Sequence, residues 1–313
     1  MRTDTLCKHA LRDFLALRQA LGFTIRTHDS TLRDFVSFLD DRKALWITSR
    51  LAVTWAKKPI HADSNWWAYR LYVARQFARY AITKDVRTEI PSADLLPFRH
   101  RRPCPYLYTK HELTQLIAAA GDLPSHNGLR ALTYSTLFGL LSVTGLRISE
   151  ALNLDCSDVD LGNDVLLIRR SKYEKTRLVP IHHSTSKALC TYACRRDEVF
   201  RTRRSESFFV TVFGHRPTHG VVNATFIELS RQTGLRGPAS RTGPRIHDMR
   251  HTFAVQTLME LYRSERDIER GVHTLSVYLG HAGPSSTYWY LSAIPELMQL
   301  ACRRIERKGG IQP

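Results

Sequence analysis

The sequence predicts a mainly α-helical protein with a small β-sheet, divided into two domains. Apolar side chains recur at helical spacing along most of the 313 residues. Two short runs rich in Val, Leu and Ile, at 165–168 and 177–181, have instead the composition of β-strands. Prolines and arginines gather between 91 and 105, a composition typical of an extended connector. Each domain is long enough to bury a core of its own.

The N-terminal domain, residues 1–97, is expected to be a helical bundle. Segment 4–20 places its apolar side chains on one helical face, and Gly22 follows where the end of a helix favours glycine. Further helices are expected over 29–43, 48–58 and 65–83. A basic, proline-rich linker over 98–105 then leads to the second domain, residues 106–313.

The sequence of the second domain predicts helices around one β-hairpin. Thr109 and Glu112 match a capping box at the start of its first helix, and a long apolar helix follows over 129–143. The two β-like runs flank a charged turn at 169–175, which predicts a hairpin with a basic tip. The remaining helices are expected over 185–201, 219–233, 247–262, 272–279 and 294–307.

The charge balance favours a polyanionic partner. Lys and Arg total 46 against 29 Asp and Glu, so the net charge is +17. No apolar run approaches the roughly 18 residues of a membrane span, and we expect a soluble, cytoplasmic protein without a membrane partner. The six cysteines include no CxxC pair, which favours reduced thiols. Cys190 and Cys194 lie four residues apart, a spacing that favours helix packing over a zinc site.

Four short strings carry residue types suited to binding a phosphate. The Walker loop, the GxSxG elbow, the HExxH pair and the dinucleotide GxGxxG motif are all missing from the sequence. Each string alone has an ordinary structural explanation, as a capping turn, a surface charge or a packed aromatic residue. The strings are TGLRISE at 144–150, the hairpin tip with Lys172, HDMRH at 247–251 and LGHAGPSSTYWY at 279–290.

In this order and spacing the four strings resemble the tyrosine recombinases, also called phage integrases, from about 106 to 293. The resemblance implies a SAM-like helical core-binding domain over 1–97 and a tyrosine recombinase catalytic domain over 106–313. It also implies that the two domains close around duplex DNA as a C-shaped clamp. The tail helix at about 294–307 would dock on a neighbouring protomer, or else on its own domain.

The resemblance also implies site residues, carried over position by position. Tyr290 stands where the family has its nucleophile, and its rival Tyr288 is disfavoured by the nine-residue step from His281. Lys172 stands where the family has its hairpin lysine, although Ser171 and Tyr173 replace the usual glycines and Lys175 remains a rival. Glu150 matches the acidic residue that orients the cluster. The full catalytic set is Arg147, Lys172, His247, Arg250, His281 and Tyr290.

The chemistry that the resemblance implies is DNA strand transfer through a 3′-phosphotyrosyl ester, without a metal ion or another cofactor. The arginines would bind the non-bridging phosphate oxygens, and the lysine would protonate the leaving 5′-oxygen. The expected partners are double-stranded DNA and further recombinase subunits, in a tetramer of this chain or an assembly with related recombinases. The expected role is integration or transposition of a mobile element. The alternatives are a non-catalytic DNA-binding relative and a type IB-like topoisomerase.

Overall fold

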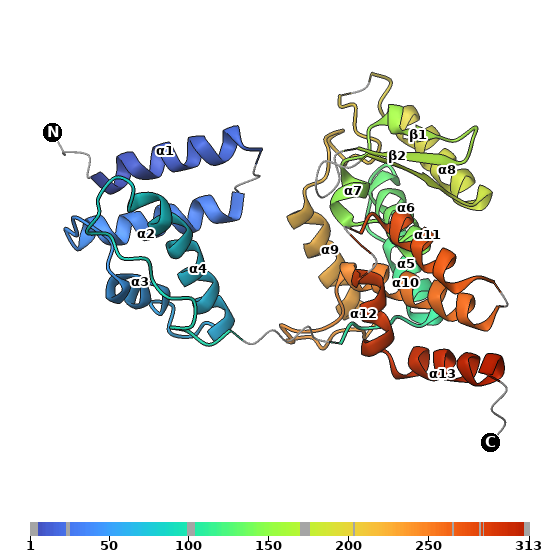
Figure 1. The fold of residues 1–313 in the computed structure, drawn as a ribbon. Coiled ribbons are helices and arrows are strands. Elements are labelled where there is room, and N and C mark those ends of the chain that lie inside the picture. Colours follow the sequence, from blue (N-terminus) through green and yellow to red (C-terminus); the bar gives the residue numbers. More distant parts are fainter. Residues whose placement is uncertain are drawn as a thin grey trace. The chain divides into compact units, whose positions relative to one another are not determined.

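The structure is a computed structural model that describes residues 6–22, 26–98, 104–169, 176–202, 204–264, 266–281, 283 and 285–309. Its internal contacts divide the chain into two compact units, residues 1–102 and 103–313 (Figure 1). Each unit has its own buried apolar core, and each is described separately below.

The N-terminal unit is a helical bundle, as the sequence predicts. Its described helices are α1 (Leu6–Ala20), α2 (Arg26–Asp41), α3 (Ser49–Ala56) and α4 (Ser64–Ala81). Phe35, Trp55 and Phe77 are fully buried where α2, α3 and α4 meet. Thr48 and Asp63 cap α3 and α4, since each side chain accepts a hydrogen bond from a backbone N–H of the first turn. The bundle therefore gains its fold from one apolar core and well-capped helices.

The C-terminal unit is helical around a small antiparallel sheet. Its sheet has the order β1–β2–β3, and Leu166 of β2 faces Val179 of β3 in the predicted hairpin. The strands are β1 (Val159–Asp160), β2 (Val165–Ile168) and β3 (Arg177–Pro180). The helices are α5 (Lys110–Gly121), α6 (Leu129–Thr144), α7 (Ile148–Leu152), α8 (His183–Val199), α9 (His219–Gln232), α10 (Ile246–Arg263), α11 (Ile268–Leu279), α12 (Ser285–Ala293) and α13 (Pro295–Gly309), with a short 3₁₀ turn at Cys156–Asp158.

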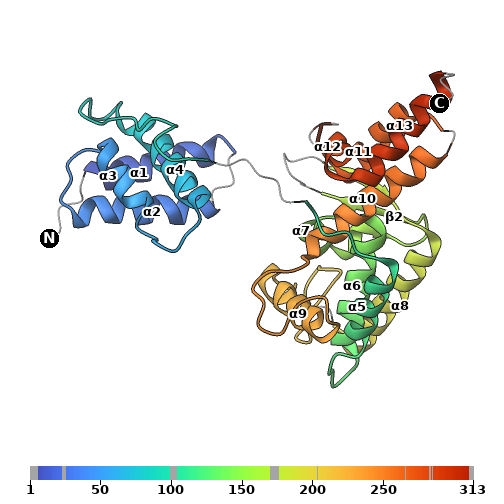
Figure 2. The ribbon, with the colours of Figure 1, turned by 90° about the horizontal axis from the view of Figure 1, so that it is seen from below.

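Helix α6 is the central element of this unit. It packs against α5, α8 and α10 (Figure 2). Its Leu137, Phe138 and Leu141 are almost completely buried. A second apolar cluster joins α10 to α11, α12 and α13. Helix α10 thus contacts both clusters. This position fixes the side chains of α10 against the end of α6 on one side and against the C-terminal helices on the other.

Most sequence predictions of elements agree with the structure. The Thr109–Glu112 capping box is present at the start of α5, and β2 spans the predicted residues. The prediction for α11 was four residues too short, because Asp267 caps the helix at Ile268 and the intervening Gly271 does not interrupt it. The segment 285–293 was not predicted as a separate helix, yet it forms α12. None of the described helices is long and apolar enough to cross a membrane.

The tail helix α13 packs on α10 of its own chain. Leu297 is fully buried in the cluster that α13 shares with α10. Arg304 donates hydrogen bonds to backbone carbonyls that follow the last turn of α10, among them those of Ser264 and Arg266. It also donates to the carbonyls of Leu261 and Tyr262 in the last turn of α10, where helical carbonyls lack N–H donors and a cation is favoured. In the single chain, the tail therefore closes the C-terminal end of α10.

Candidate active site

The turn between α6 and α7 positions the first arginine. Gly145 ends α6 with φ +61°, and a Cβ atom there would lie 2.6 Å from Phe253. Only glycine fits this left-handed position without displacing that ring. Arg147 follows as the residue before α7, and its backbone N–H donates to the Glu150 carboxylate at 3.0 Å. The TGLRISE string thus folds as a capped turn that presents a guanidinium.

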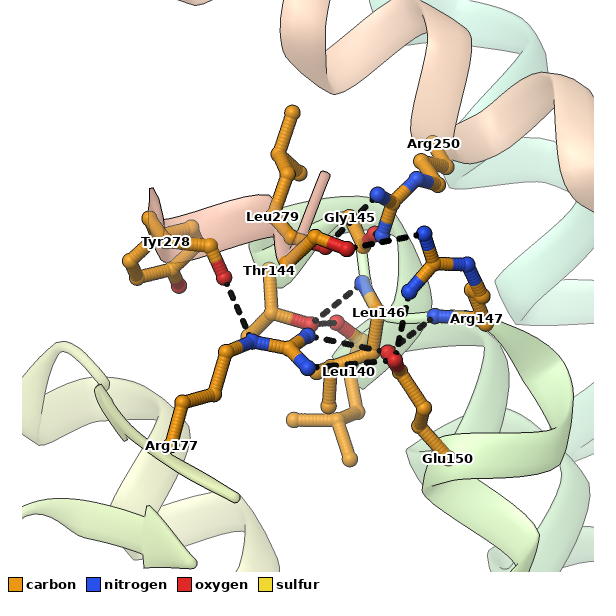
Figure 3. A network of polar contacts seen from close by, with 11 residues as sticks. Leu140, Thr144, Gly145, Leu146, Arg147, Glu150, Arg177, Arg250, Tyr278 and Leu279 are labelled. Carbon is orange, nitrogen blue, oxygen red and sulfur yellow. Dashed lines mark hydrogen bonds and ion pairs between the residues drawn. The ribbon is translucent and has the colours of Figure 1, made fainter. Parts of the chain in front are cut away.

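Glu150 is a buried carboxylate that receives hydrogen bonds from two guanidinium groups. Arg147 Nη1 donates to Oε1 at 2.7 Å, and Arg177 donates to both oxygens at 3.1 and 3.0 Å (Figure 3). Burial alone would raise the pKa of Glu150, but the hydrogen bonds and charges of Arg177 and Arg147 outweigh it and lower this pKa. The carboxylate is therefore ionised at neutral pH and orients both arginines.

Arg177 was not assigned any role from the sequence. It lies on β3, with a side chain that is 9% exposed, and its Nε donates to the carbonyl of Tyr278 at 2.8 Å. Gly280 lies directly beside it: φ is +65°, and a Cβ atom would lie 2.7 Å from Arg177 Nη1. The β-hairpin, the end of α11 and the Arg147 turn are thereby joined through one side chain.

Arg250 joins the same region from α10. Its two terminal nitrogens donate to the carbonyls of Gly145, at 2.8 Å, and Leu279, at 2.7 Å, and its residue surface is only 3% exposed. Figure 3 shows its guanidinium beside that of Arg147. Burial, and then the charge of Arg147, lower the pKa of Arg250 to about 10. Two guanidinium groups held this close together attract an anion.

The histidines of the site are neutral at physiological pH. Burial, followed by the charges of Arg250 and Arg147, lowers the pKa of His281 to about 4. The Nδ1 atom of His281 is 2.9 Å from Oγ1 of the fully buried Thr287, which fixes the ring. His247 retains contact with solvent, but partial burial and then Arg250 lower its pKa as well. Both rings can donate a hydrogen bond without adding charge.

Tyr290 lies inside the same cluster on α12. Its surface is 2% exposed, whereas the neighbouring Tyr288 is 45% exposed. The Tyr290 hydroxyl is 2.7 Å from Nδ1 of His251, and the two rings are 5.6 Å apart between centroids. Ionised Tyr290 would lie close enough to Arg250 to raise the pKa of that guanidinium. The buried phenol is thus near the cations and not in a remote part of the core.

The structure brings together the predicted residues that it describes. Arg147, the α10 residues His247 and Arg250, and the pair His281 and Tyr290 come from three segments far apart in the sequence and meet at α10. Lys172 and its rival Lys175 lie outside the described residues.

Three residues of the site were missed by sequence reasoning: Arg177, His251 and Thr287. For His251 a signal was present, since His247 and His251 are four residues apart and share a helical face. No group of three or more His, Cys, Asp or Glu side chains within the described parts of the chain could hold a metal ion.

The family model described as "Phage integrase family" matches residues 107–296. The chain belongs to the phage integrase family. A relative from Sinorhizobium fredii (strain NBRC 101917 / NGR234), named "Putative integrase/recombinase y4rB", is 45% identical over 305 residues, which cover 96% of this chain and 97% of the relative. Tyrosine recombinase XerC of Chlamydia caviae is 27% identical over 256 residues, covering 82% of this chain and 74% of that protein.

Solved structures share the fold of this phage integrase family member. The Tn1549 transposon integrase in complex with transposon right end DNA has a TM-score of 0.64 and 16% identity, covering 97% of this chain and 99% of that one. XerH site-specific recombinase, in a post-cleavage complex with a palindromic difH substrate, has a TM-score of 0.61 and 17% identity, with coverages of 94% and 81%. The predicted fold class and family are confirmed. Membership supports DNA strand transfer in site-specific recombination as the activity of this integrase.

Proposed function

We propose that this integrase cleaves and rejoins DNA through a covalent 3′-phosphotyrosyl bond to Tyr290. The observation that carries the proposal is the placement of the Tyr290 phenol in one cluster with Arg147 and Arg250. In the cleavage step the phenolic oxygen bonds to phosphorus, the phenolic proton leaves, and the bond from phosphorus to the 5′-oxygen breaks. The ester keeps the energy of the phosphodiester, so that the 5′-hydroxyl of another strand can reverse the step.

The two arginines supply the electrostatic part of the proposal. Each terminal nitrogen of Arg147 and Arg250 carries two hydrogens, and the hydrogen bonds to Glu150 and to backbone carbonyls use one on each. The second hydrogens are available for the non-bridging oxygens of a phosphate. Donors placed for charge that grows in the transition state are typically worth about 3–4 kcal/mol each. The rigid backbone contacts hold them in place before DNA arrives.

The remaining step of the proposal is protonation of the leaving 5′-oxygen. We assign it to Lys172, in the segment of the sequence between β2 and β3, on the resemblance to the family. An ammonium whose pKa is lowered by neighbouring arginines is suited to this task. Since the chemistry consists of proton transfers and charge stabilisation, we propose that it requires neither a metal ion nor ATP.

Duplex DNA is the proposed substrate, bound by the core-binding and catalytic units as a clamp. The net charge of +17 supports a polyanionic partner, and binding should weaken steeply with salt. Some structures with this fold contain several subunits, such as a lambda integrase tetramer bound to a Holliday junction. We propose a comparable tetramer, or an assembly with related recombinases, in which α13 could leave α10 and dock on a neighbour. The 45% identity to an integrase/recombinase supports integration or transposition of a mobile element as the role.

The decisive experiment is covalent trapping. The purified chain first selects duplexes from a random-sequence pool, and the selected site is then rebuilt with a nick so that cleavage becomes irreversible. Wild-type protein should form a protein–DNA adduct, Tyr290→Phe should form none, and the matched control Tyr288→Phe should resemble the wild type. An adduct in Tyr290→Phe would overturn the assignment. Site-specific binding without any adduct would indicate a non-catalytic relative, and supercoil relaxation without site preference would indicate a topoisomerase.

The lysine assignment needs a separate test with a 5′-thio leaving group, which departs without a proton. Lys172→Ala should lose cleavage of the ordinary site and regain it on the thio-substituted site. Arg250→Ala should not regain it, because its defect lies in binding the phosphate. Rescue of Lys175→Ala in place of Lys172→Ala would transfer the role of acid to Lys175.

A further inference from the structure

His251 contacts the atom that the proposed function makes the nucleophile. Its Nδ1 lies 2.7 Å from Tyr290 Oη, and the planes of the two rings meet at 66°. His251 directly follows Arg250 on α10. Its ring packs edge-on against that of His247, with 4.7 Å between the ring centroids. The indole of Trp289 lies 6.1 Å away on the α12 side. The imidazole is therefore held between two helices with one nitrogen aimed at the phenol.

We propose that His251 accepts the phenolic proton of Tyr290 as the tyrosine oxygen attacks phosphorus. This inference rests on the proposed function and adds a catalytic residue to it. The electron pair of Oη forms the bond to phosphorus, and the proton moves from Oη to Nδ1. The bond from phosphorus to the 5′-oxygen breaks, and that oxygen takes its proton from the separate acid assigned above. On rejoining, the imidazolium returns the proton to Oη.

The charge state of His251 suits a proton acceptor. Burial and then the neighbouring His247 lower the pKa of His251 to about 4. Arg245 and Arg250 lower it further, and Asp248 acts in the opposite direction. The ring is therefore neutral at pH 7, and with its hydrogen on Nε2 the Nδ1 lone pair accepts the phenolic hydrogen. A cationic ring could only donate here and would leave no base beside the phenol.

The other histidines of the site are placed for different contacts. His281 already shares its Nδ1 with Thr287 at 2.9 Å, and His247 presents its ring to His251. Burial lowers the pKa of His251 to about 4, so its imidazolium is a much stronger acid than a free phenol, and complete proton transfer before attack is unfavourable. The proton must therefore move while the oxygen–phosphorus bond forms, when the phenol becomes far more acidic. A bound phosphate would add negative charge near the ring and favour the imidazolium at that moment.

The test compares two substitutions that separate basicity from hydrogen bonding. In His251→Asn the amide oxygen takes nearly the place of Nδ1, so the phenol keeps an acceptor that cannot hold a proton. In His251→Phe the ring remains and the acceptor is lost. The matched control is His273→Asn, an exposed histidine on α11. On the nicked duplex selected by the wild-type chain, His251→Asn should form the adduct roughly 100-fold more slowly, with DNA affinity unchanged.

A more acidic nucleophile gives a readout that a structural role would not change. Replacing Tyr290 with 3,5-difluorotyrosine lowers the pKa of the phenol and reduces the need for a base. The fluorinated His251→Asn protein should regain about tenfold or more of its lost rate, while fluorination of the wild type should give a smaller gain. Circular dichroism of each variant shows that the fold is kept, and the asparagine variant suffices if the phenylalanine variant does not fold.

The outcomes separate this inference from the function on which it rests. If the wild type forms no Tyr290-dependent adduct, the proposed function fails. If the wild type forms the adduct and His251→Asn matches it, only the role of His251 as proton acceptor is overturned. Slow cleavage by His251→Phe together with normal cleavage by His251→Asn would likewise reduce His251 to a residue that positions the phenol.

Discussion

Arg177 and Glu150 form a two-point ion pair, in which both terminal nitrogens of the guanidinium donate to the two oxygens of the carboxylate. The side chains are 9% and 4% exposed. Because Glu150 also binds Arg147, and Arg177 also binds the carbonyl of Tyr278, this pair connects the β-hairpin to Arg147 and to the end of α11. The position of β3 is thereby linked to that of Arg147.

Removing one partner of this pair should destabilise the chain. Arg177→Met leaves Glu150 with Arg147 alone, and breaking a buried pair in this way typically costs about 3 kcal/mol or more. We expect a lower urea midpoint by circular dichroism and, because Arg147 loses its fixed position, adduct formation that is roughly 100-fold slower. The control Arg195→Met breaks the exposed pair with Glu198 and an exposed hydrogen bond to the carbonyl of Asn127, and it should cost at most about 1 kcal/mol. Equal losses in the two variants would contradict this account.

The lowered pKa of Glu150 predicts a pH dependence with a definite sign. Its folded pKa lies below the unfolded value of about 4.3, so the carboxylate stabilises the fold above that value and the gain is lost as the pH falls through the folded pKa. The stability difference between wild type and Glu150→Gln should therefore be largest above about pH 5 and should narrow below pH 4. Urea titrations across this range measure it, with Glu198→Gln as the exposed control. A stability difference between wild type and Glu150→Gln that grows as the pH falls would refute the prediction.

Gly280 should tolerate no side chain. Alanine there must adopt φ near +65°, which costs about 1–2 kcal/mol, and its Cβ would press on Arg177 Nη1 at 2.7 Å. We expect Gly280→Ala to lower both stability and the rate of adduct formation. Gly283→Ala is the matched control, since a Cβ at that position meets nothing within 4 Å. The prediction fails if the two variants behave alike.

Thr287 should matter through the orientation of His281. Thr287→Val keeps the volume of this fully buried residue and removes the hydroxyl 2.9 Å from His281 Nδ1. Loss of one such hydrogen bond is worth about 1 kcal/mol, so we expect adduct formation to slow by a factor of roughly 5–10 while DNA affinity is unchanged. The control Thr274→Val removes an exposed hydroxyl that bonds only within α11. A wild-type rate for Thr287→Val would show that His281 needs no such support.

Much of this architecture follows from local sequence patterns. The Thr109–Glu112 capping box and the run at 165–168 act within a few residues, so periodicity and capping were sufficient to predict α5 and β2. The four strings that supply the proposed site residues were identified because their order resembles a known family. The start of α11 was misplaced because a glycine in the first turn hid the cap at Asp267.

Contacts between distant segments could not be predicted in the same way. The residues around Arg177 indicate only that it belongs to a strand. Its partner Glu150 is 27 residues away, so only the tertiary structure shows that Arg177 belongs to the site. His251 adjoins Arg250 within a recognised string, yet its hydrogen-bond partner Tyr290 lies 39 residues further on. Periodicity and motif spacing therefore cannot predict side chains whose role depends on a partner far away in the sequence.

The burial of Tyr290 has a consequence for the cell that holds this integrase. A phenol that is 2% exposed and hydrogen-bonded to an imidazole is shielded from DNA that the protein meets by chance. Under the proposed mechanism, binding at a proper site must provide the free energy that brings a phosphate to Tyr290 Oη while this oxygen keeps its contact with His251. Under the proposed mechanism, the resting integrase would thus present no exposed nucleophile to DNA outside its own sites.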